Sequence, residues 1–256
     1  MSDNPSTLEN WKAKLDDARG LLNRHIDEVR QDYARKRVKR PIYRGPEHDW
    51  YAVWFAFWAA FCEKTITFLP APQPRIFRFI EGQDEKSVKQ ELIPDYGVMR
   101  VFRPRRSSPY PRRSTRSDVP TVSKRWVALQ EIKPPPVTTA TEEGVWDGIR
   151  EAEKDLERQV QLFFAAEIPM QEAVIGICAS GEWWTWDVYT KDDVKPLSKH
   201  EDGDYRTSVE LPDEDDADEE PRVAYKLNTE ESNTAILELR AAIQGLRGFD
   251  GFDENL

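Results

Sequence analysis

Apolar residues along this chain follow two spacings, one typical of helices and one typical of strands. Apolar faces or all-apolar runs predict helices over residues 6–35, 48–66, 145–166 and 229–246. Continuous or alternating apolar runs predict strands over residues 75–80, 88–101, 126–133, 173–179, 183–189 and 222–227. Prolines at positions 70, 72 and 74 predict a stiff connector. The order predicts an α/β (α+β) protein with a central mixed β-sheet flanked by helices and with N- and C-terminal helical extensions.

Two predicted strands carry charged residues at their ends. Segment 88–101 is either one strand or two strands that meet at Pro94, and Asp95 stands at the head of its second apolar run. Strand 126–133 ends in Glu131 and Lys133, which point to the same face because side chains alternate along a strand. A core strand has no structural need for two charges on one face. We therefore interpret Asp95, Glu131 and Lys133 as one site.

The residue types of this site suit a hard divalent cation. Two carboxylates on neighbouring strands offer oxygen ligands to Mg²⁺ or Mn²⁺, and the backbone carbonyl of Ile132 offers another. Such a cation activates a water molecule and stabilises charge on a phosphate. Lys133 would orient that water or help to deprotonate it, and would neutralise developing charge.

These motifs resemble the PD-(D/E)XK nuclease superfamily. Pro94-Asp95 matches the PD, and Glu131-Ile132-Lys133 matches the (D/E)XK. The predicted order of helix, three strands, helix and strand, from about residue 48 to about residue 190, is similar to the restriction-endonuclease-like core of that superfamily. The resemblance implies metal-dependent hydrolysis of nucleic acid, with Asp95 and Glu131 holding the metal and Lys133 assisting the water.

The same resemblance points to supporting residues on the two core helices. Gln159-x-x-x-Phe163 is similar to the QxxxY motif of exonuclease-like branches, with Phe in place of Tyr, so Gln159 joins the predicted catalytic set. The metal-binding acid of the first helix maps to Glu63, although Glu47 and Asp49 compete for that position. His48 is a further candidate ligand, as in cap-snatching relatives.

Charge is strongly segregated along the 256 residues, whose net charge is −10. Residues 100–125 contain nine Lys/Arg and one acid, and residues 201–220 contain eleven Asp/Glu and one Arg. The basic loop 103–120 joins the two motif strands, so its arginines are predicted to contact nucleic-acid phosphates. They are Arg103, Arg105, Arg106, Arg112, Arg113 and Arg116. The acidic segment is a solvated loop or a mask for the basic loop.

The chain divides into four predicted parts. Residues 1–45 carry an amphipathic helix and a basic segment, 46–197 the core, 198–221 the acidic loop, and 222–256 a strand and helix that pack on the core. The polar N-terminus predicts no signal peptide, and the longest apolar stretch is too short to span a membrane. Cys62 and Cys178 are predicted to be buried thiols. We expect an intracellular protein, nuclear or cytoplasmic.

Three functional interpretations stay open at this stage. The first is the nuclease, with DNA or RNA as substrate. The second is a catalytically inactive member of the same fold that binds nucleic acid or protein. The third is an interaction protein built on the N-terminal helix and the charge-segregated tails, with a homodimer or a protein partner bound through that helix. Without any site, Asp95 would only end a strand, and Glu131 and Lys133 would be surface ions on an edge strand.

Tryptophans give one further alternative. Trp183, Trp184 and Trp186 could stack on unpaired bases or pack in the core, and core packing is favoured. Trp50, Trp54 and Trp58 recur at a spacing of four residues and are predicted to lie in the core.

Overall fold

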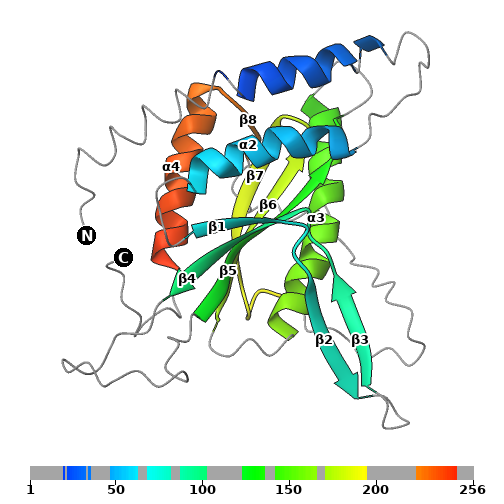
Figure 1. The fold of residues 1–256 in the computed structure, drawn as a ribbon, viewed down its shortest axis with the longest axis vertical. Helices are drawn as coiled ribbons and strands as arrows, with labels where there is room; N and C mark the ends of the chain where they lie inside the picture. The colour runs from blue at the N-terminus through cyan, green and yellow to red at the C-terminus, as the bar shows by residue number, and fades with distance from the viewer. Residues whose placement is uncertain are drawn as a thin grey trace, which may run out of the picture.

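The computed structural model describes ten stretches of the chain (Figure 1). They are residues 20, 22–32, 34–35, 47–62, 68–81, 87–102, 123–135, 142–165, 171–194 and 223–246. The basic loop 103–120, the acidic loop 198–221 and the six candidate arginines fall outside them, as do Glu63 and residues 6–19 of the first predicted helix. Those predictions stay predictions.

A mixed sheet forms the centre of the molecule, as predicted. Its six strands in the described residues are β1 (Phe68–Pro72), β4 (Tyr96–Phe102), β5 (Ser123–Lys133), β6 (Ala173–Ser180), β7 (Trp183–Thr190) and β8 (Tyr225–Lys226), in that spatial order. Neighbours are antiparallel except β5 and β6, which are parallel because α3 (Glu142–Ala165) connects them.

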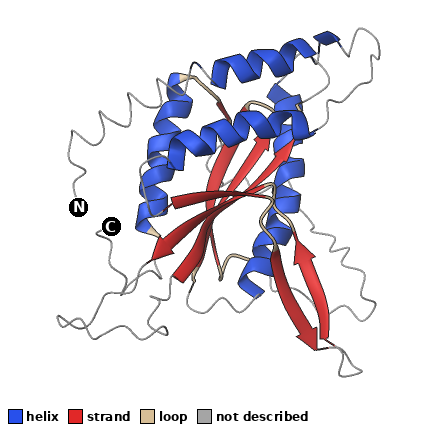
Figure 2. Ribbon diagram, in the orientation of Figure 1, coloured by secondary structure: helices blue, strands red, loops and turns tan. Residues whose placement is uncertain are grey.

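Helices cover both faces of the sheet (Figure 2). The one-turn 3₁₀ helix η1 (Glu47–Trp50) leads into α2 (Tyr51–Cys62), which packs with α4 (Glu230–Gly245) on one face. Helix α3 packs on the other face. Thr229 caps α4 by accepting a hydrogen bond from the backbone N–H of Ser232 at 3.2 Å. The predicted helices are confirmed wherever the structure describes them.

The N-terminal helix packs on the body of the protein. Residues 22–32 are helical, and Leu22 and Ile26 are buried in the same apolar cluster as α2 and α4. Arg30 donates hydrogen bonds to Glu182 in the turn between β6 and β7. The helix therefore has a docking position on its own chain, while its predicted role in binding a partner stays a prediction.

The prediction of a proline-rich connector around Pro70 is wrong. Residues Phe68–Pro72 form strand β1, which pairs with β4 from Phe68 opposite Arg100 to Pro72 opposite Tyr96. Among the residues that the structure describes, strand β1 lies at the edge of the sheet and pairs only with β4. Because proline lacks only the N–H, an edge strand accommodates it wherever that position faces away from the ladder.

The segment before Asp95 forms a separate hairpin. Strands β2 (Ile76–Glu81) and β3 (Ser87–Leu92) pair only with each other in the described residues and extend away from the main sheet (Figure 1). Segment 88–101 is thus two strands that meet at Pro94, which confirms the second of the two alternatives. The expectation that residues 75–80 join the main sheet is wrong.

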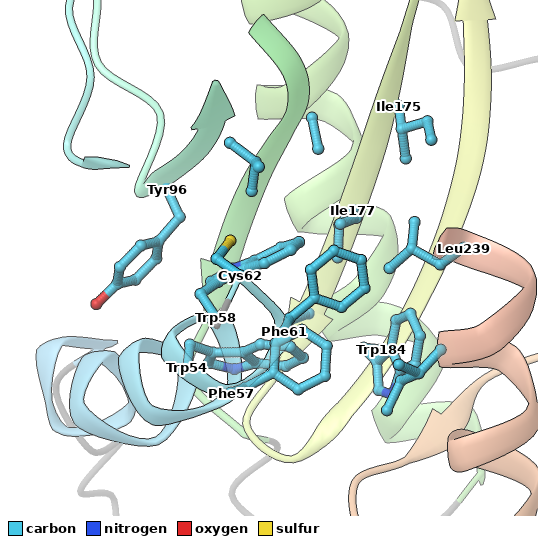
Figure 3. Packing of buried hydrophobic residues seen from close by; sticks show 14 of the residues in the cluster. Trp54, Phe57, Trp58, Phe61, Cys62, Tyr96, Ile175, Ile177, Trp184 and Leu239 are labelled. Atoms are coloured by element: carbon cyan, nitrogen blue, oxygen red, sulfur yellow. The ribbon is translucent and has the colours of Figure 1, made fainter. Parts of the chain in front are cut away.

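Aromatic side chains fill the space between α2 and the sheet (Figure 3). Trp54 of α2 meets Trp184 of β7 edge to face, with ring centroids 6.5 Å apart. Trp50, Trp54 and Trp58 are buried, which confirms the core prediction. Trp184 is fully buried and its neighbours Trp183 and Trp186 are partly buried, so this cluster also belongs to the core. Cys62 and Cys178 are buried thiols, as predicted.

The buried indole of Trp184 donates a hydrogen bond from its Nε1–H to Ser232 Oγ at 3.0 Å. Ser232→Ala is expected to lower the free energy of unfolding by about 1–2 kcal/mol, because the indole N–H loses this acceptor. Urea denaturation measures the change. Thr234→Ala, an exposed hydroxyl on the same helix, is the control and should change stability by less than about 0.5 kcal/mol. Equal effects of the two substitutions would contradict the role of this bond.

None of the helices in the described stretches combines the length and apolar character that crossing a membrane requires.

Candidate active site

Asp95, Glu131 and Lys133 lie together at one end of two interior strands. Strands β4 and β5 are antiparallel, with Tyr96 opposite Gln130, so Asp95 directly precedes the pair at the position that faces Glu131. The three residues are 6%, 7% and 8% exposed. The alternative of surface ions on an edge strand is therefore wrong, since β5 lies between β4 and β6.

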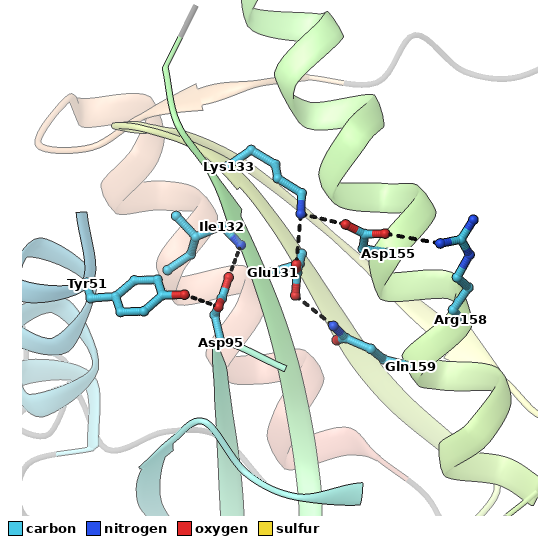
Figure 4. Close-up of polar contacts among 8 residues, drawn as sticks. All are labelled: Tyr51, Asp95, Glu131, Ile132, Lys133, Asp155, Arg158 and Gln159. Carbon is cyan, nitrogen blue, oxygen red and sulfur yellow. Dashed lines mark hydrogen bonds and ion pairs between the residues drawn. The ribbon is translucent and has the colours of Figure 1, made fainter. Parts of the chain in front are cut away.

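Asp95 receives three hydrogen bonds, of which the two to its carboxylate are drawn in Figure 4. Its Oδ2 accepts a hydrogen bond from the backbone N–H of Ile132 at 2.8 Å, and its Oδ1 accepts one from the hydroxyl of Tyr51. The backbone N–H of Gln73 donates to the carbonyl of Asp95 at 2.8 Å. Helix α2, strand β5 and the chain leaving β1 thus fix the position of this carboxylate.

Glu131 accepts hydrogen bonds on both carboxylate oxygens. Lys133 Nζ donates to Oε1 at 3.0 Å, and Gln159 Nε2 donates to Oε2 at 2.7 Å. Burial raises the pKa of Glu131 to about 7, with a further increase from the nearby charge of Asp95 that Lys133 and Gln159 only partly offset. Two buried carboxylates that repel each other form an environment that stabilises a bound cation.

Lys133 lies between two carboxylates. Its Nζ donates to Asp155 Oδ2 at 2.5 Å as well as to Glu131 Oε1. Burial favours a lower pKa for Lys133, but the hydrogen bonds and charges of Asp155 and Glu131 outweigh burial and place its pKa above the ordinary value. Lys133 is therefore an ammonium at neutral pH, which donates hydrogen bonds and stabilises negative charge but accepts no proton.

Helix α3 brings two polar side chains to the site from one face. Asp155 and Gln159 are four residues apart, so they lie one above the other on the helix. Sequence analysis identified Gln159 but missed Asp155, although the spacing of four from Gln159 was a signal for it. It also missed Tyr51, for which no signal exists because it stands in a run of core aromatic residues.

The end of strand β5 is anchored to the core. The backbone N–H of Gly181 donates to the carbonyl of Lys133 at 2.9 Å, and the indole of Trp54 donates to the carbonyl of Gly181 at 3.1 Å. Gly181 has φ +61°, and a Cβ there would meet Pro135 at 2.8 Å, so this turn requires glycine. The end of β5 that carries Lys133 is thus tied to the turn between β6 and β7 and, through Trp54, to α2.

Helix α2 approaches the site with its N-terminal end. Tyr51 is its first residue, and at 1.5 Å a residue the last, Cys62, lies about 16 Å further along the axis. Glu63, predicted as the metal-binding acid, is outside the described residues, and Cys62 before it is buried in the aromatic core. Helix α2 contacts Asp95 through the hydroxyl of Tyr51, which donates a hydrogen bond to the carboxylate. Of the competing acids, Asp49 lies in η1, two residues before Tyr51.

The donor set fits a hard divalent cation held by few protein ligands. Within the described stretches, no group of three or more His, Cys, Asp or Glu side chains converges as a cation site. The charge of Asp95 is close enough to Glu131 to raise the pKa of that carboxyl, and Mg²⁺ is commonly bound by one or two carboxylates together with water. The predicted third ligand, the Ile132 carbonyl, belongs to the residue whose N–H holds Asp95.

Comparison of the chain with family models, with curated proteins and with solved structures finds no match.

Proposed function

We propose that this protein is a divalent-metal-dependent nuclease of the PD-(D/E)XK type. The observation that carries the proposal is the burial of Asp95, Glu131 and Lys133 at adjoining ends of β4 and β5, with Lys133 bonded to Glu131 at 3.0 Å. The order α2, β1, β4, β5, α3 and β6 also corresponds to the helix, three strands, helix and strand of the restriction-endonuclease-like core. The β2–β3 hairpin is an insertion between the first two of these strands.

The residues of the site have separate tasks. Asp95, Glu131 and the Ile132 carbonyl would hold Mg²⁺ or Mn²⁺, which when bound lowers the pKa of a water ligand and stabilises phosphate charge. The hydroxyl of Tyr51 and the N–H of Ile132 orient Asp95, and Gln159 orients Glu131. These bonds pre-organise both carboxylates, so little reorganisation is needed during the reaction.

Lys133 acts on the phosphate as a cation. Hydrolysis joins a water oxygen to phosphorus and breaks one ester P–O bond, and negative charge gathers on the phosphoryl oxygens and the leaving oxygen. The ammonium of Lys133, buried and hydrogen-bonded to Glu131, stabilises that charge by hydrogen bonding. As an ammonium it has no lone pair to serve as a base, so the proton that the water loses passes to solvent, from which the leaving oxygen is protonated.

One observation favours the second interpretation, a binding module without hydrolysis. Both carboxylate oxygens of Asp95 and both of Glu131 already accept hydrogen bonds from protein donors. Such a closed network is stable without a cation, as it would be in an inactive member of the same fold.

A cleavage assay separates the two interpretations. The full chain is incubated with labelled single-stranded DNA, double-stranded DNA or single-stranded RNA, in Mg²⁺, in Mn²⁺ or in EDTA. We expect cleavage of at least one polymer with metal and none with EDTA. Asp95→Asn should lower the rate, whereas Asp147→Asn, an exposed acid on α3, should not. Salt-sensitive binding of these polymers without cleavage in either metal would establish the binding module and overturn the nuclease.

A further inference from the structure

The carboxylate of Asp155 bridges two cations at the outer side of the site. Its Oδ2 lies 2.5 Å from Lys133 Nζ, and its Oδ1 lies 3.5 Å from Arg158 NH1 (Figure 4). The side chains of Asp155 and Arg158 are 37% and 43% exposed, whereas that of Lys133 is 10% exposed. One anionic group thus connects the buried cation to a cation that solvent reaches.

The same pair of cations suits a phosphodiester. A backbone phosphate has two non-bridging oxygens that share one negative charge, as the two oxygens of a carboxylate do. Lysine and arginine bind phosphate and carboxylate through the same charge-assisted hydrogen bonds. A phosphate that approached Lys133 from solvent would meet Asp155 first and would compete with it for both cations.

We propose that Lys133 and Arg158 form a subsite for a backbone phosphate of nucleic acid, and that the Asp155 carboxylate occupies this subsite when no substrate is bound. The proposal deepens the nuclease assignment and rests on it, because it names the contact that places a phosphate beside Glu131. The phosphate replaces Asp155, whose partly exposed side chain turns towards solvent. No covalent step is involved.

Competition between Asp155 and a phosphate predicts that nucleic-acid affinity rises when the Asp155 charge is removed, which a purely structural role of Asp155 does not predict. If Asp155 only positioned Lys133, its removal would weaken nucleic-acid binding or leave it unchanged. If Asp155 competes with the phosphate, its neutral isostere strengthens binding.

Asp147 and Arg150 provide matched controls on the same helix. Arg150 NH1 lies 3.1 Å from Asp147 Oδ1, an ion pair with the same spacing of three residues as Asp155 and Arg158 but without a buried lysine. Asp155→Asn and Arg158→Gln are therefore compared with Asp147→Asn and Arg150→Gln. Each pair of variants changes the net charge equally, so a general electrostatic effect cancels.

The experiment is a salt titration of binding in EDTA, where cleavage does not interfere. The anisotropy of a fluorescent single-stranded DNA of twenty nucleotides, and of RNA of the same length, reports the dissociation constant. Asp155→Asn is expected to bind about tenfold more tightly than Asp147→Asn, because the competing carboxylate is lost. Arg158→Gln is expected to bind more weakly than Arg150→Gln, with a salt slope smaller by about one.

Binding by Asp155→Asn that is equal to or weaker than binding by Asp147→Asn would overturn the subsite, and so would equal affinities of the two arginine variants. Thermal melting of each variant confirms that it is folded. Should Asp155→Asn be unfolded, the arginine pair decides alone. If the expected affinity differences are found but no polymer is cleaved with metal, the phosphate subsite stands and the proposed nuclease activity is wrong. If cleavage is present without these differences, the hydrolysis stands and the subsite fails.

Discussion

Lys133→Met is expected to reduce nucleic-acid cleavage about 100- to 1,000-fold, the cost of removing one preorganised stabiliser of transition-state charge. Methionine keeps the length and much of the apolar stem of lysine but has no ammonium. The neighbouring carboxylates of Asp95 and Glu131 remain, so divalent-cation binding should persist. The measurement is the single-turnover rate at saturating Mn²⁺, with cation binding followed separately.

Lys154→Met is the control for this substitution. Lys154 is an exposed residue of α3, and its replacement changes the net charge by the same amount. Its rate should stay close to that of the unchanged protein. Lys133→Met with full activity would show that the ammonium takes no part in catalysis. Lys133→Met that no longer binds the cation would assign Lys133 a structural role.

Glu131→Gln is expected to change how stability depends on pH. In the folded protein burial raises the pKa of Glu131 from its ordinary value of 4.5 to about 7, so between these values the folded state holds a proton that the unfolded state has lost. The contribution of Glu131 is thus fully present below about pH 4.5 and is lost as pH rises through about 7. Glutamine mimics the protonated acid and does not titrate.

The free energy of unfolding, measured by urea denaturation in EDTA at pH 5 and pH 8, tests this expectation. Relative to Glu131→Gln, the unchanged protein should lose up to about 3 kcal/mol between the two pH values. Mn²⁺ at pH 8 should restore stability to the unchanged protein by binding the ionised carboxylates, and should restore less to the variant. Parallel pH profiles of the two proteins would contradict the buried, proton-binding Glu131.

Strand periodicity was sufficient to predict the central pair of strands and its charged residues. Glu131 and Lys133 are two positions apart in a strand, so a shared face follows from backbone geometry. The structure places Lys133 Nζ 3.0 Å from Glu131 Oε1. Gln159 was predicted on its helix and indeed donates to Glu131. These relations are local, or follow from a motif with a fixed order of elements.

The features that sequence analysis missed depend on tertiary pairing. Strand β1 contains two prolines, which local propensity assigns to a connector, and only its edge position makes them acceptable. The contact of Tyr51 with Asp95 depends on which end of α2 lies beside Asp95. The apolar sequence of this helix does not indicate that end. The spacing of four from Gln159 places Asp155 on the same face of α3, but its contact with Lys133 depends on how α3 packs against β5.

The central claim is that Asp95 and Glu131 together hold a divalent cation, and calorimetric titration of Mn²⁺ into the full chain at pH 8 tests it most directly. We predict one site that is lost in Asp95→Asn and in Glu131→Gln and is retained in Lys133→Met. Absence of binding in the unchanged protein, or equal binding in Asp95→Asn, would contradict the account.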